Sequence, residues 1–232
     1  MATYKIAVLG GDGIGPEVAR EGLKALRAAS EVYGFNVELT DYPYCTDHFL
    51  KTGETLPDSA LAEMAQHDAI FLGAIGAPRV EVGMLERAII AGLRFGLDLY
   101  VNLRPIRLYD ERLCPIKGKK PEDIDFTVIR ENTEGAYAGI GGIMRKGSAY
   151  EVATQSMVYT RNGVERVIRY AFDVCRARNK KKRLTLVDKA NAIRAQDLWT
   201  RTFNEVGKEY PDIELDHGYV DATCMWMIKR PE

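Results

Sequence analysis

Hydrophobic and polar positions follow two different spacings along the chain, and each spacing predicts a different kind of element. Residues 4–9 form an almost continuously apolar run, which is typical of a buried strand. Residues 16–29 carry apolar positions at helical spacing, and Pro16 stands near the first turn, where proline is tolerated. Residues 35–39 form a second short apolar run. These three segments predict a strand–helix–strand unit at the N-terminus.

The same alternation continues to the end of the chain. Strands are predicted at residues 69–72, 125–131, 150–160, 184–188 and 213–221, and helices at residues 59–66, 84–93, 161–175 and 195–206. Thr160 is a suitable N-cap for the third of these helices. Strands that alternate with helices in this way predict an α/β protein.

A soft domain boundary is predicted near residue 100. The segment LDLYVNLRP, residues 97–105, is extended because Pro105 disfavours the helical region for Arg104. We therefore expect a first α/β domain at residues 1–100 and a second at residues 101–232. No internal repeat, low-complexity segment or Gly/Ser linker separates the two.

Composition and charge exclude several classes of protein. The 32 basic and 33 acidic residues leave a formal net charge of −1, so no overall field would attract nucleic acid or an anionic membrane. No apolar run reaches the length of a membrane span. The four cysteines include no C-x-x-C pair, which indicates a reducing, cytoplasmic location. The basic run at residues 179–183 is interpreted as a solvated helix end, with nucleic-acid binding as the alternative.

The glycine cluster GGDGIGPE, which begins at Gly10, resembles a dinucleotide-binding loop only in part. Gly11 and Gly13 fit the G-x-G-x-x-G fingerprint, and Glu38 lies near the expected acidic position, but Pro16 stands where the third glycine is required. A Rossmann fold is therefore disfavoured. The simpler interpretation is that the glycines permit a strand-to-helix turn with positive φ.

Three arginines on separate segments are candidates for binding an acidic substrate. Arg94, Arg104 and Arg130 each lie close to apolar or glycine-bearing sequence. A guanidinium group binds a carboxylate in a two-point manner, so two or three arginines that converge would hold a dicarboxylic acid. Taken singly, each could equally be a surface ion-pair partner.

Three further side chains could carry proton or metal chemistry. Tyr137 follows a strand and a turn, a common place for functional groups. Lys189 directly follows the apolar strand LTLVD, where partial burial can adapt a lysine to proton transfer. Asp221 ends another strand, but one carboxylate supplies too few oxygen ligands for a divalent metal. From the residues alone, packing or solvated roles stay open for all three.

Taken together, six ordered segments resemble the β-decarboxylating dehydrogenase family, which includes isopropylmalate, isocitrate, homoisocitrate and tartrate/malate dehydrogenases. They are GGDGIGPE, LRFGLDLYVNLRP, IRENTEGAYAG, YTRNGVERVIRYAF, LVDKAN and YVDATCMWM, and the similarity runs from residue 5 to residue 231. The resemblance implies a three-layer α/β fold of isopropylmalate/isocitrate dehydrogenase type with two subdomains. In this fold the glycine turn lies beside the cofactor, outside any Rossmann domain.

The activity that the resemblance implies is a metal-dependent oxidative decarboxylation of a 2-hydroxy dicarboxylic acid with NAD and Mg²⁺ or Mn²⁺. The matching positions for substrate binding are Arg94, Arg104, Arg130, Asp221 and Ile90. The acid/base pair is Tyr137 and Lys189, and Asp221 is also a metal ligand. The cofactor-side positions are Ile14, Gly76, Ala77, Pro78 and Asn191.

The segment before Arg94 bears on the choice of substrate. Ile90 and Ala91 are apolar, which favours an alkyl group and therefore 3-isopropylmalate, an intermediate of leucine biosynthesis. An isocitrate enzyme would be expected to carry serine in place of Ala88. Arg87 leaves homoisocitrate open, and tartrate or D-malate and a non-catalytic regulatory subunit on the same scaffold are further alternatives.

The resemblance also implies a homodimer, with the active site shared between subunits and the interface on the second domain. Members of the family continue with an N-x-F-G-D type segment that carries two more metal-ligand aspartates, followed by a loop that binds the adenosine half of NAD. Neither is found in residues 1–232. We therefore expect this chain to be an N-terminal portion with an incomplete first domain, inactive in isolation, and its preference for NAD over NADP stays open.

Overall fold

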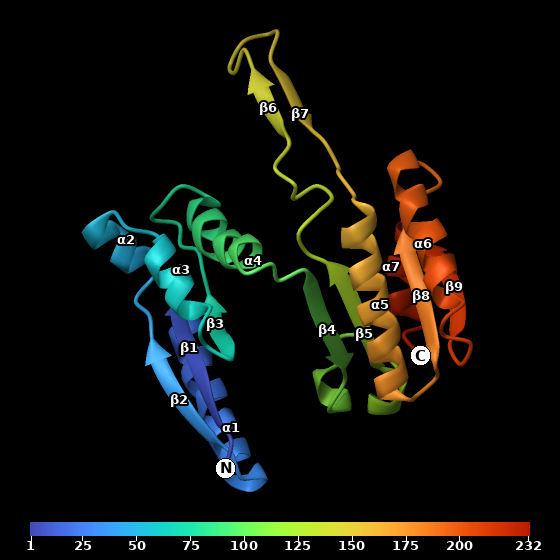
Figure 1. Cartoon of the computed structure of the whole chain (residues 1–232), viewed down its shortest axis with the longest axis horizontal. Coiled ribbons are helices and arrows are strands. Elements are labelled where there is room, and N and C mark those ends of the chain that lie inside the picture. Colours follow the sequence, from blue (N-terminus) through green and yellow to red (C-terminus); the bar gives the residue numbers. More distant parts are fainter. The chain divides into compact units, whose positions relative to one another are not determined.

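A computed structural model describes all residues from Met1 to Glu232 (Figure 1). The chain divides into two compact units, Met1–Asp98 and Leu99–Glu232.

The first unit is built on a parallel three-stranded sheet. Its strands are β1 (Thr3–Gly11), β2 (Asn36–Asp41) and β3 (Ala69–Ala74), in the order β2-β1-β3. Helix α1 (Gly15–Tyr33) connects β1 to β2 and ends at Gly34, whose φ of 70° suits glycine. The central strand β1 has four consecutive buried residues, which explains its continuously apolar sequence. The predicted strand–helix–strand unit is confirmed.

Short helices complete the first unit. These are α2 (Thr46–Thr52), α3 (Asp58–Met64), a π-helical segment (Glu86–Ala91) and α4 (Gly92–Gly96). Their buried side chains pack against β1 in one core of Ala7, Leu9, Met64, Leu85, Ile89 and Leu93. The helix predicted at residues 84–93 exists, but its first part has the wider π geometry, and α2 was not predicted.

The second unit contains three separate strand pairs. Strands β4 (Val101–Arg107) and β5 (Asp125–Glu131) are antiparallel, as are β6 (Gly141–Met144) and β7 (Val152–Gln155), whereas β8 (Arg183–Asp188) and β9 (Glu214–Tyr219) are parallel. The helices are α5 (Arg161–Arg178), α6 (Asp197–Gly207) and α7 (Val220–Lys229). Single 3₁₀ turns lie at Glu111–Leu113, Pro121–Asp123 and Arg194–Gln196. Thr160 caps α5 as predicted, because its side chain accepts a hydrogen bond of 3.0 Å from the Gly163 amide.

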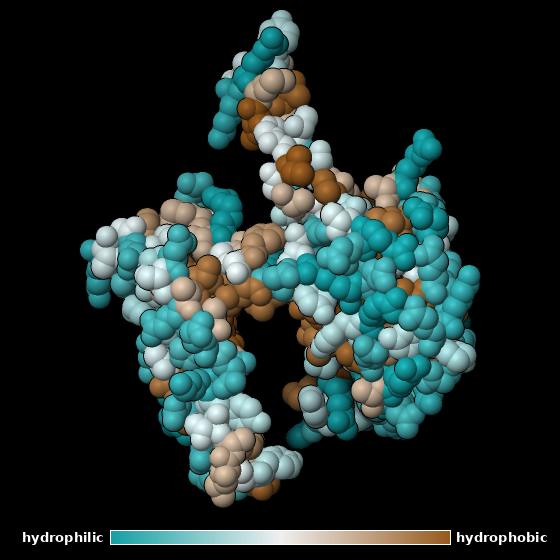
Figure 2. Space-filling view, in the orientation of Figure 1, coloured by the Kyte–Doolittle hydropathy of each residue, from teal (hydrophilic) through white to brown (hydrophobic).

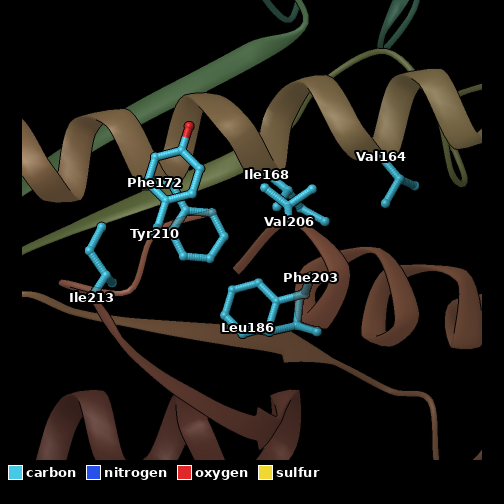
Figure 3. Close-up of a cluster of buried hydrophobic side chains, with 8 residues drawn as sticks. All are labelled: Val164, Ile168, Phe172, Leu186, Phe203, Val206, Tyr210 and Ile213. Atoms are coloured by element: carbon cyan, nitrogen blue, oxygen red, sulfur yellow. The ribbon is translucent and has the colours of Figure 1, made fainter. Parts of the chain in front are cut away.

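The core of the second unit lies between α5, α6 and β8 (Figure 3). Phe172 of α5 is fully buried and stacks on Tyr210 and Phe203, with ring centroids 4.6 and 5.4 Å apart. The other members are Val164, Ile168, Leu186, Val206 and Ile213. The apolar stripe of α5 therefore has the burial that its helical spacing predicted.

The hairpin formed by β6 and β7 differs from the other strand pairs of the unit because every residue of its two strands is exposed. A single strand was predicted over residues 150–160, but β7 covers only Val152–Gln155, and its partner β6 was not predicted. Ile143, Met144 and Val152 are exposed hydrophobic residues on the hairpin, and Figure 2 shows hydrophobic surface on this segment at the top of the view. A two-stranded hairpin without a buried face is only marginally stable by itself.

Candidate functional site

The glycine turn between β1 and α1 combines tight packing with an open surface. Gly11 and Gly13 have φ values of 78° and 56°, which an L side chain adopts only with strain. A Cβ on buried Gly15 would lie 2.3 Å from the Gly10 carbonyl oxygen. By contrast, a Cβ on Gly13 would meet nothing within 4 Å, and the Ile14 side chain beside it is 65% exposed. The exposed Gly13–Ile14 edge therefore has the room that a flat cofactor ring would need.

The loop after β3 contains the other cofactor-side candidates of this unit and contacts the glycine turn. The Asp12 amide donates a hydrogen bond of 2.6 Å to the Ala74 carbonyl oxygen. Gly76 has a φ of 120°, so the loop bends sharply at this glycine, and Ala77 and Pro78 follow it. Two segments that are about 60 positions apart in the sequence, Ile14 and Gly76–Pro78, thus belong to one surface region of the first unit.

Two substrate-side candidates also lie in the first unit. Ile90 is in the π-helical segment and Arg94 is in α4, and both are partly buried. They are four positions apart on one continuous helical path, so both side chains lie on the same side of it. Arg87 on this segment is an exposed residue whose Nη2 lies 3.7 Å from Glu81 Oε1.

In the second unit, β4 and β5 bring Arg104, Arg130 and Tyr137 together. Asn102 is directly opposite Arg130 in the antiparallel register, and Arg104 is two residues farther along β4, so all three side chains share one face of the strand pair. Arg104 Nε donates a hydrogen bond of 2.7 Å to Asn102 Oδ1. The Arg130 guanidinium lies over the Tyr137 ring, 4.7 Å from its centroid. Asn102 was missed by the sequence analysis, which treated residues 97–105 only as an extended segment.

The opposite face of β4 carries a shallow hollow that contains no candidate residue. It is lined by Leu103, Pro105 and Arg107 of β4, together with residues of β5 and α5. Because side chains alternate along a strand, this hollow and the Arg104 side chain are on different faces. The hollow therefore does not identify the site.

Lys189 and Asp221 form an ion pair beyond the carboxyl ends of β8 and β9. Asp221 was predicted to end a strand over residues 213–221, but β9 ends at Tyr219 and Asp221 lies in the first turn of α7. The two strands are parallel and pair Asp188 with Tyr219, so the residues that follow them lie at the same edge. Lys189 Nζ is 2.7 Å from Asp221 Oδ1. The hydrogen bond from Lys189 lowers the pKa of the Asp221 carboxyl below its ordinary value. Parallel pairing thus joins two candidates that are 32 positions apart in the sequence.

Side chains that were not predicted hold the loop at Lys189 in place. Gln196 Oε1 accepts a hydrogen bond of 2.5 Å from the Lys189 amide, and its Nε2 donates one of 3.0 Å to the Tyr159 hydroxyl. Asn191, the cofactor-side candidate on this loop, is exposed. Gln196 braces the lysine through the backbone, a role with no local signature in the sequence.

Buried Asp188 braces the same loop from the strand side. Its Oδ1 accepts a hydrogen bond of 3.0 Å from the Ala190 amide, and its Oδ2 accepts one of 3.2 Å from the Thr200 hydroxyl. His217 Nε2 is 3.0 Å from the same Oδ2. Loss of any of these three polar contacts would leave a buried carboxylate oxygen with fewer partners, which costs free energy. The Asp188 carboxylate therefore holds the loop firmly in place.

The residues of this chain do not form a metal site by themselves. No group of three or more His, Cys, Asp or Glu side chains has an arrangement that could hold a metal ion. Asp221, the predicted ligand, contributes one carboxylate, whereas Mg²⁺ and Mn²⁺ require several oxygen ligands.

No helix has both the length and the apolar composition that a membrane crossing demands.

Comparison with known proteins identifies the family. The sequence model of the isocitrate/isopropylmalate dehydrogenase family matches residues 5–232. The chain is 51% identical over 230 residues to a protein named 3-isopropylmalate dehydrogenase from Thermobifida fusca, and 50% identical over 229 residues to one of the same name from Corynebacterium glutamicum. These alignments cover 99% and 98% of this chain, which spans 65% of the length of each relative.

The fold leads to the same result. The crystal structure of isocitrate dehydrogenase from Methylococcus capsulatus superposes with a TM-score of 0.84 at 35% sequence identity, covering 98% of this chain and 64% of that one. The chain therefore belongs to the isocitrate/isopropylmalate dehydrogenase family and has its α/β fold. The resemblance found in the sequence is confirmed.

Proposed function

We propose that this chain is the substrate- and cofactor-binding portion of an enzyme that oxidises and decarboxylates 3-isopropylmalate with NAD. The main support for the reaction type is the Lys189–Asp221 ion pair, in which Nζ and Oδ1 are 2.7 Å apart beyond the carboxyl ends of two parallel strands. Two relatives that are 51% and 50% identical to this chain are named 3-isopropylmalate dehydrogenase, and this name supports 3-isopropylmalate as the substrate. The neighbouring Arg104 and Arg130 side chains supply the positive charge that a dicarboxylate requires.

Substrate binding is assigned to the arginines and Ile90. In the proposal, Arg104 and Arg130 bind substrate carboxylate oxygens through guanidinium N–H groups, and family membership assigns the same role to Arg94. Ile90 contacts the alkyl group. Arg87 is 69% exposed and is near Glu81, an arrangement that disfavours a further carboxylate at this position.

The chemical steps are assigned to Lys189 and Tyr137. Lys189 acts in its neutral form: its ammonium first loses a proton to solvent and leaves the ion pair with Asp221. Nζ then accepts the proton of the 2-hydroxyl group as the hydride leaves C2, which produces a 2-keto acid. NAD, when bound, supplies the acceptor for that hydride. The bond between C3 and its carboxylate then breaks, carbon dioxide leaves, and the electron pair remains as an enolate. The Tyr137 hydroxyl protonates C3, and the Arg130 guanidinium that covers its ring holds it in position.

A divalent cation and NAD complete the proposal. Asp221 supplies one oxygen ligand, which is fewer than Mg²⁺ or Mn²⁺ requires. Dependence on one of these cations is therefore proposed from family membership. For NAD, the proposed contacts in the first unit are the open edge at Gly13–Ile14 and the loop at Gly76–Pro78. Asn191 is assigned to the cofactor from family membership.

The decisive experiment is an assay of the full-length protein by NADH absorbance. The acids are 3-isopropylmalate, D-malate, tartrate, homoisocitrate and isocitrate, each with NAD and Mg²⁺. We expect the highest kcat/KM for 3-isopropylmalate and a loss of at least about 100-fold with EDTA, restored by excess Mg²⁺ or Mn²⁺. A higher kcat/KM for another acid would reassign the substrate, and a folded protein that reduces NAD with none of them would be a non-catalytic subunit.

We also propose that the protein is a homodimer in which α7 is covered by the second subunit. The sequence of α7, VDATCMWMIK, is rich in large apolar residues, yet none of its residues is buried. Val220, Met225, Trp226 and Ile228 are all exposed. Apolar surface gathered on one helix in this way marks an interaction site. The unburied β6–β7 hairpin is a second element that a partner would stabilise.

Replacing Ile228 with aspartate is expected to weaken this dimer. A charge in an apolar interface lacks a partner, so sedimentation velocity should show monomer at concentrations where the wild type is dimeric. The control is Leu113→Asp, because Leu113 is similarly exposed, 73%, but belongs to a separate 3₁₀ turn. Dimers of unchanged strength in Ile228→Asp, or equal weakening in both variants, would contradict the assignment of α7 to the interface.

A further inference from the structure

Asp12, in the middle of the glycine turn, has no role in the function proposed above. The residue is 6% exposed, and its carboxylate is bonded to backbone amides rather than to a cation. Oδ1 accepts a hydrogen bond of 2.8 Å from the Thr46 amide, and Oδ2 accepts one of 2.9 Å from the Gly76 amide. Burial of a carboxylate is costly, so these two bonds have to be retained for the turn to keep its geometry.

These bonds join three segments of the first unit. Asp12 belongs to the glycine turn, Thr46 begins α2, and Gly76 is in the loop after β3. Two of the three are the segments assigned to the cofactor, Gly13–Ile14 and Gly76–Pro78. The side chain of Asp12 therefore spans the gap between the two cofactor-side segments.

The backbones of the glycine turn and of β3 approach each other closely beside Asp12. A Cβ on Gly11 would lie 1.9 Å from the Ala74 carbonyl oxygen, and one on Gly73 would lie 2.1 Å from the Gly10 carbonyl oxygen. The turn and the end of β3 are thus in direct contact at the base. Beyond that base, the bond from the Gly76 amide is what ties the loop to the turn.

We propose that Asp12 is a positioning residue for dinucleotide binding: it sets the spacing between the Gly13–Ile14 turn and the Gly76–Pro78 loop. The inference rests on the proposed function, because it assumes that NAD binds along these two segments. Asp12 itself need not touch the cofactor. It acts through the loop whose amide it holds.

The test is Asp12→Asn, which keeps the shape of the side chain. The amide nitrogen of asparagine would face one of the two N–H donors, so one hydrogen bond is lost and the other loses its charge assistance, which weakens the hold on the loop. We expect KM for NAD to rise about 10- to 100-fold, which is the range for loss of a hydrogen bond to a charged group. We expect kcat at saturating NAD and KM for 3-isopropylmalate to change less than about twofold, because Lys189 and the arginines are untouched.

A matched pair at residue 46 tests the other bond of Asp12, which holds its carboxylate in place, from the donor side. Thr46→Pro removes the amide N–H at the first position of α2, where proline is tolerated, and Cys45 already has the extended backbone that proline requires of its predecessor. Thr46→Val keeps the N–H and removes only a hydroxyl that has no hydrogen-bond partner. We expect a raised KM for NAD in Thr46→Pro and a wild-type value in Thr46→Val.

NADH binding is measured separately by fluorescence titration of each full-length variant, and thermal unfolding checks folding. Weaker NADH binding in Asp12→Asn and Thr46→Pro, at unchanged kcat, supports the proposal. Wild-type affinity in folded Asp12→Asn overturns it, as do equal losses in kcat and in both KM values. If Asp12→Asn does not fold, the residue-46 pair decides by the same criteria. If the wild type neither binds NADH nor reduces NAD, the proposed function has failed, and this inference fails with it.

Discussion

Replacement of Lys189 with methionine is expected to lower kcat about 10²- to 10⁴-fold, the usual contribution of a general acid–base group. Methionine has nearly the same length and keeps the contacts of the stem, but it cannot accept the hydroxyl proton. KM for 3-isopropylmalate should change little, because the carboxylates are assigned to the arginines. The measurement is steady-state NADH production by the full-length protein, combined with substrate binding by calorimetry.

A loss of activity in Lys189→Met would not reflect unfolding. The Lys189 and Asp221 side chains are 31% and 68% exposed, and an ion pair with this much solvent contact contributes only about 0–1 kcal/mol to stability. The backbone of the loop stays fixed by Gln196, which bonds the amide of residue 189 and not its side chain. The control is Lys208→Met, at an exposed lysine after α6. Turnover close to that of the wild type in Lys189→Met would refute the role of this lysine.

Replacement of Phe172 with alanine is expected to lower the free energy of unfolding by about 3–5 kcal/mol. The ring is fully buried, and it stacks on both Phe203 and Tyr210 (Figure 3). Removing it takes away the transfer free energy of the ring and leaves a cavity between α5 and α6 that the remaining side chains fill only in part. Aromatic stacking adds a smaller contribution.

Tryptophan fluorescence during urea unfolding measures this effect selectively, because both tryptophans, Trp199 and Trp226, belong to the second unit. Trp199 packs against the same core as Phe172. Tyr150→Ala is the control: Tyr150 is 74% exposed, so its loss should change stability by no more than about 0.5 kcal/mol. An unfolding midpoint in Phe172→Ala as high as in the control would mean that this core does not hold the unit together.

The regular elements with a strong apolar period were predictable because burial by itself produces that period. The strand at β1, the helix α5 and the cap at Thr160 are all visible in the sequence. The elements that were missed have no such period. Helix α2 has one buried residue, and helix α7 and the β6–β7 hairpin have none, so no periodic pattern of burial marks them in the sequence.

For the candidate site, the reactive side chains could be identified from the sequence, but which side chains lie next to them in space could not. Lys189 and Asp221 were singled out separately, and their 2.7 Å contact follows from the parallel register of β8 and β9. Likewise, the common face of Arg104 and Arg130 follows from the pairing of β4 with β5. The register depends on how two strands pair, so it cannot be deduced from the sequence of either strand alone.

The sequence by itself determined the α/β class, the order of most helices and strands, and the family, because these depend on local spacing and on motifs of adjacent residues. Only the tertiary structure decided what braces the site: Gln196 under the Lys189 amide, and Asp12 between two loops. Each of these side chains bonds a group that another segment or loop brings into reach. Polar groups of ordinary composition become positioning residues when folding removes them from water and leaves one partner within hydrogen-bond distance.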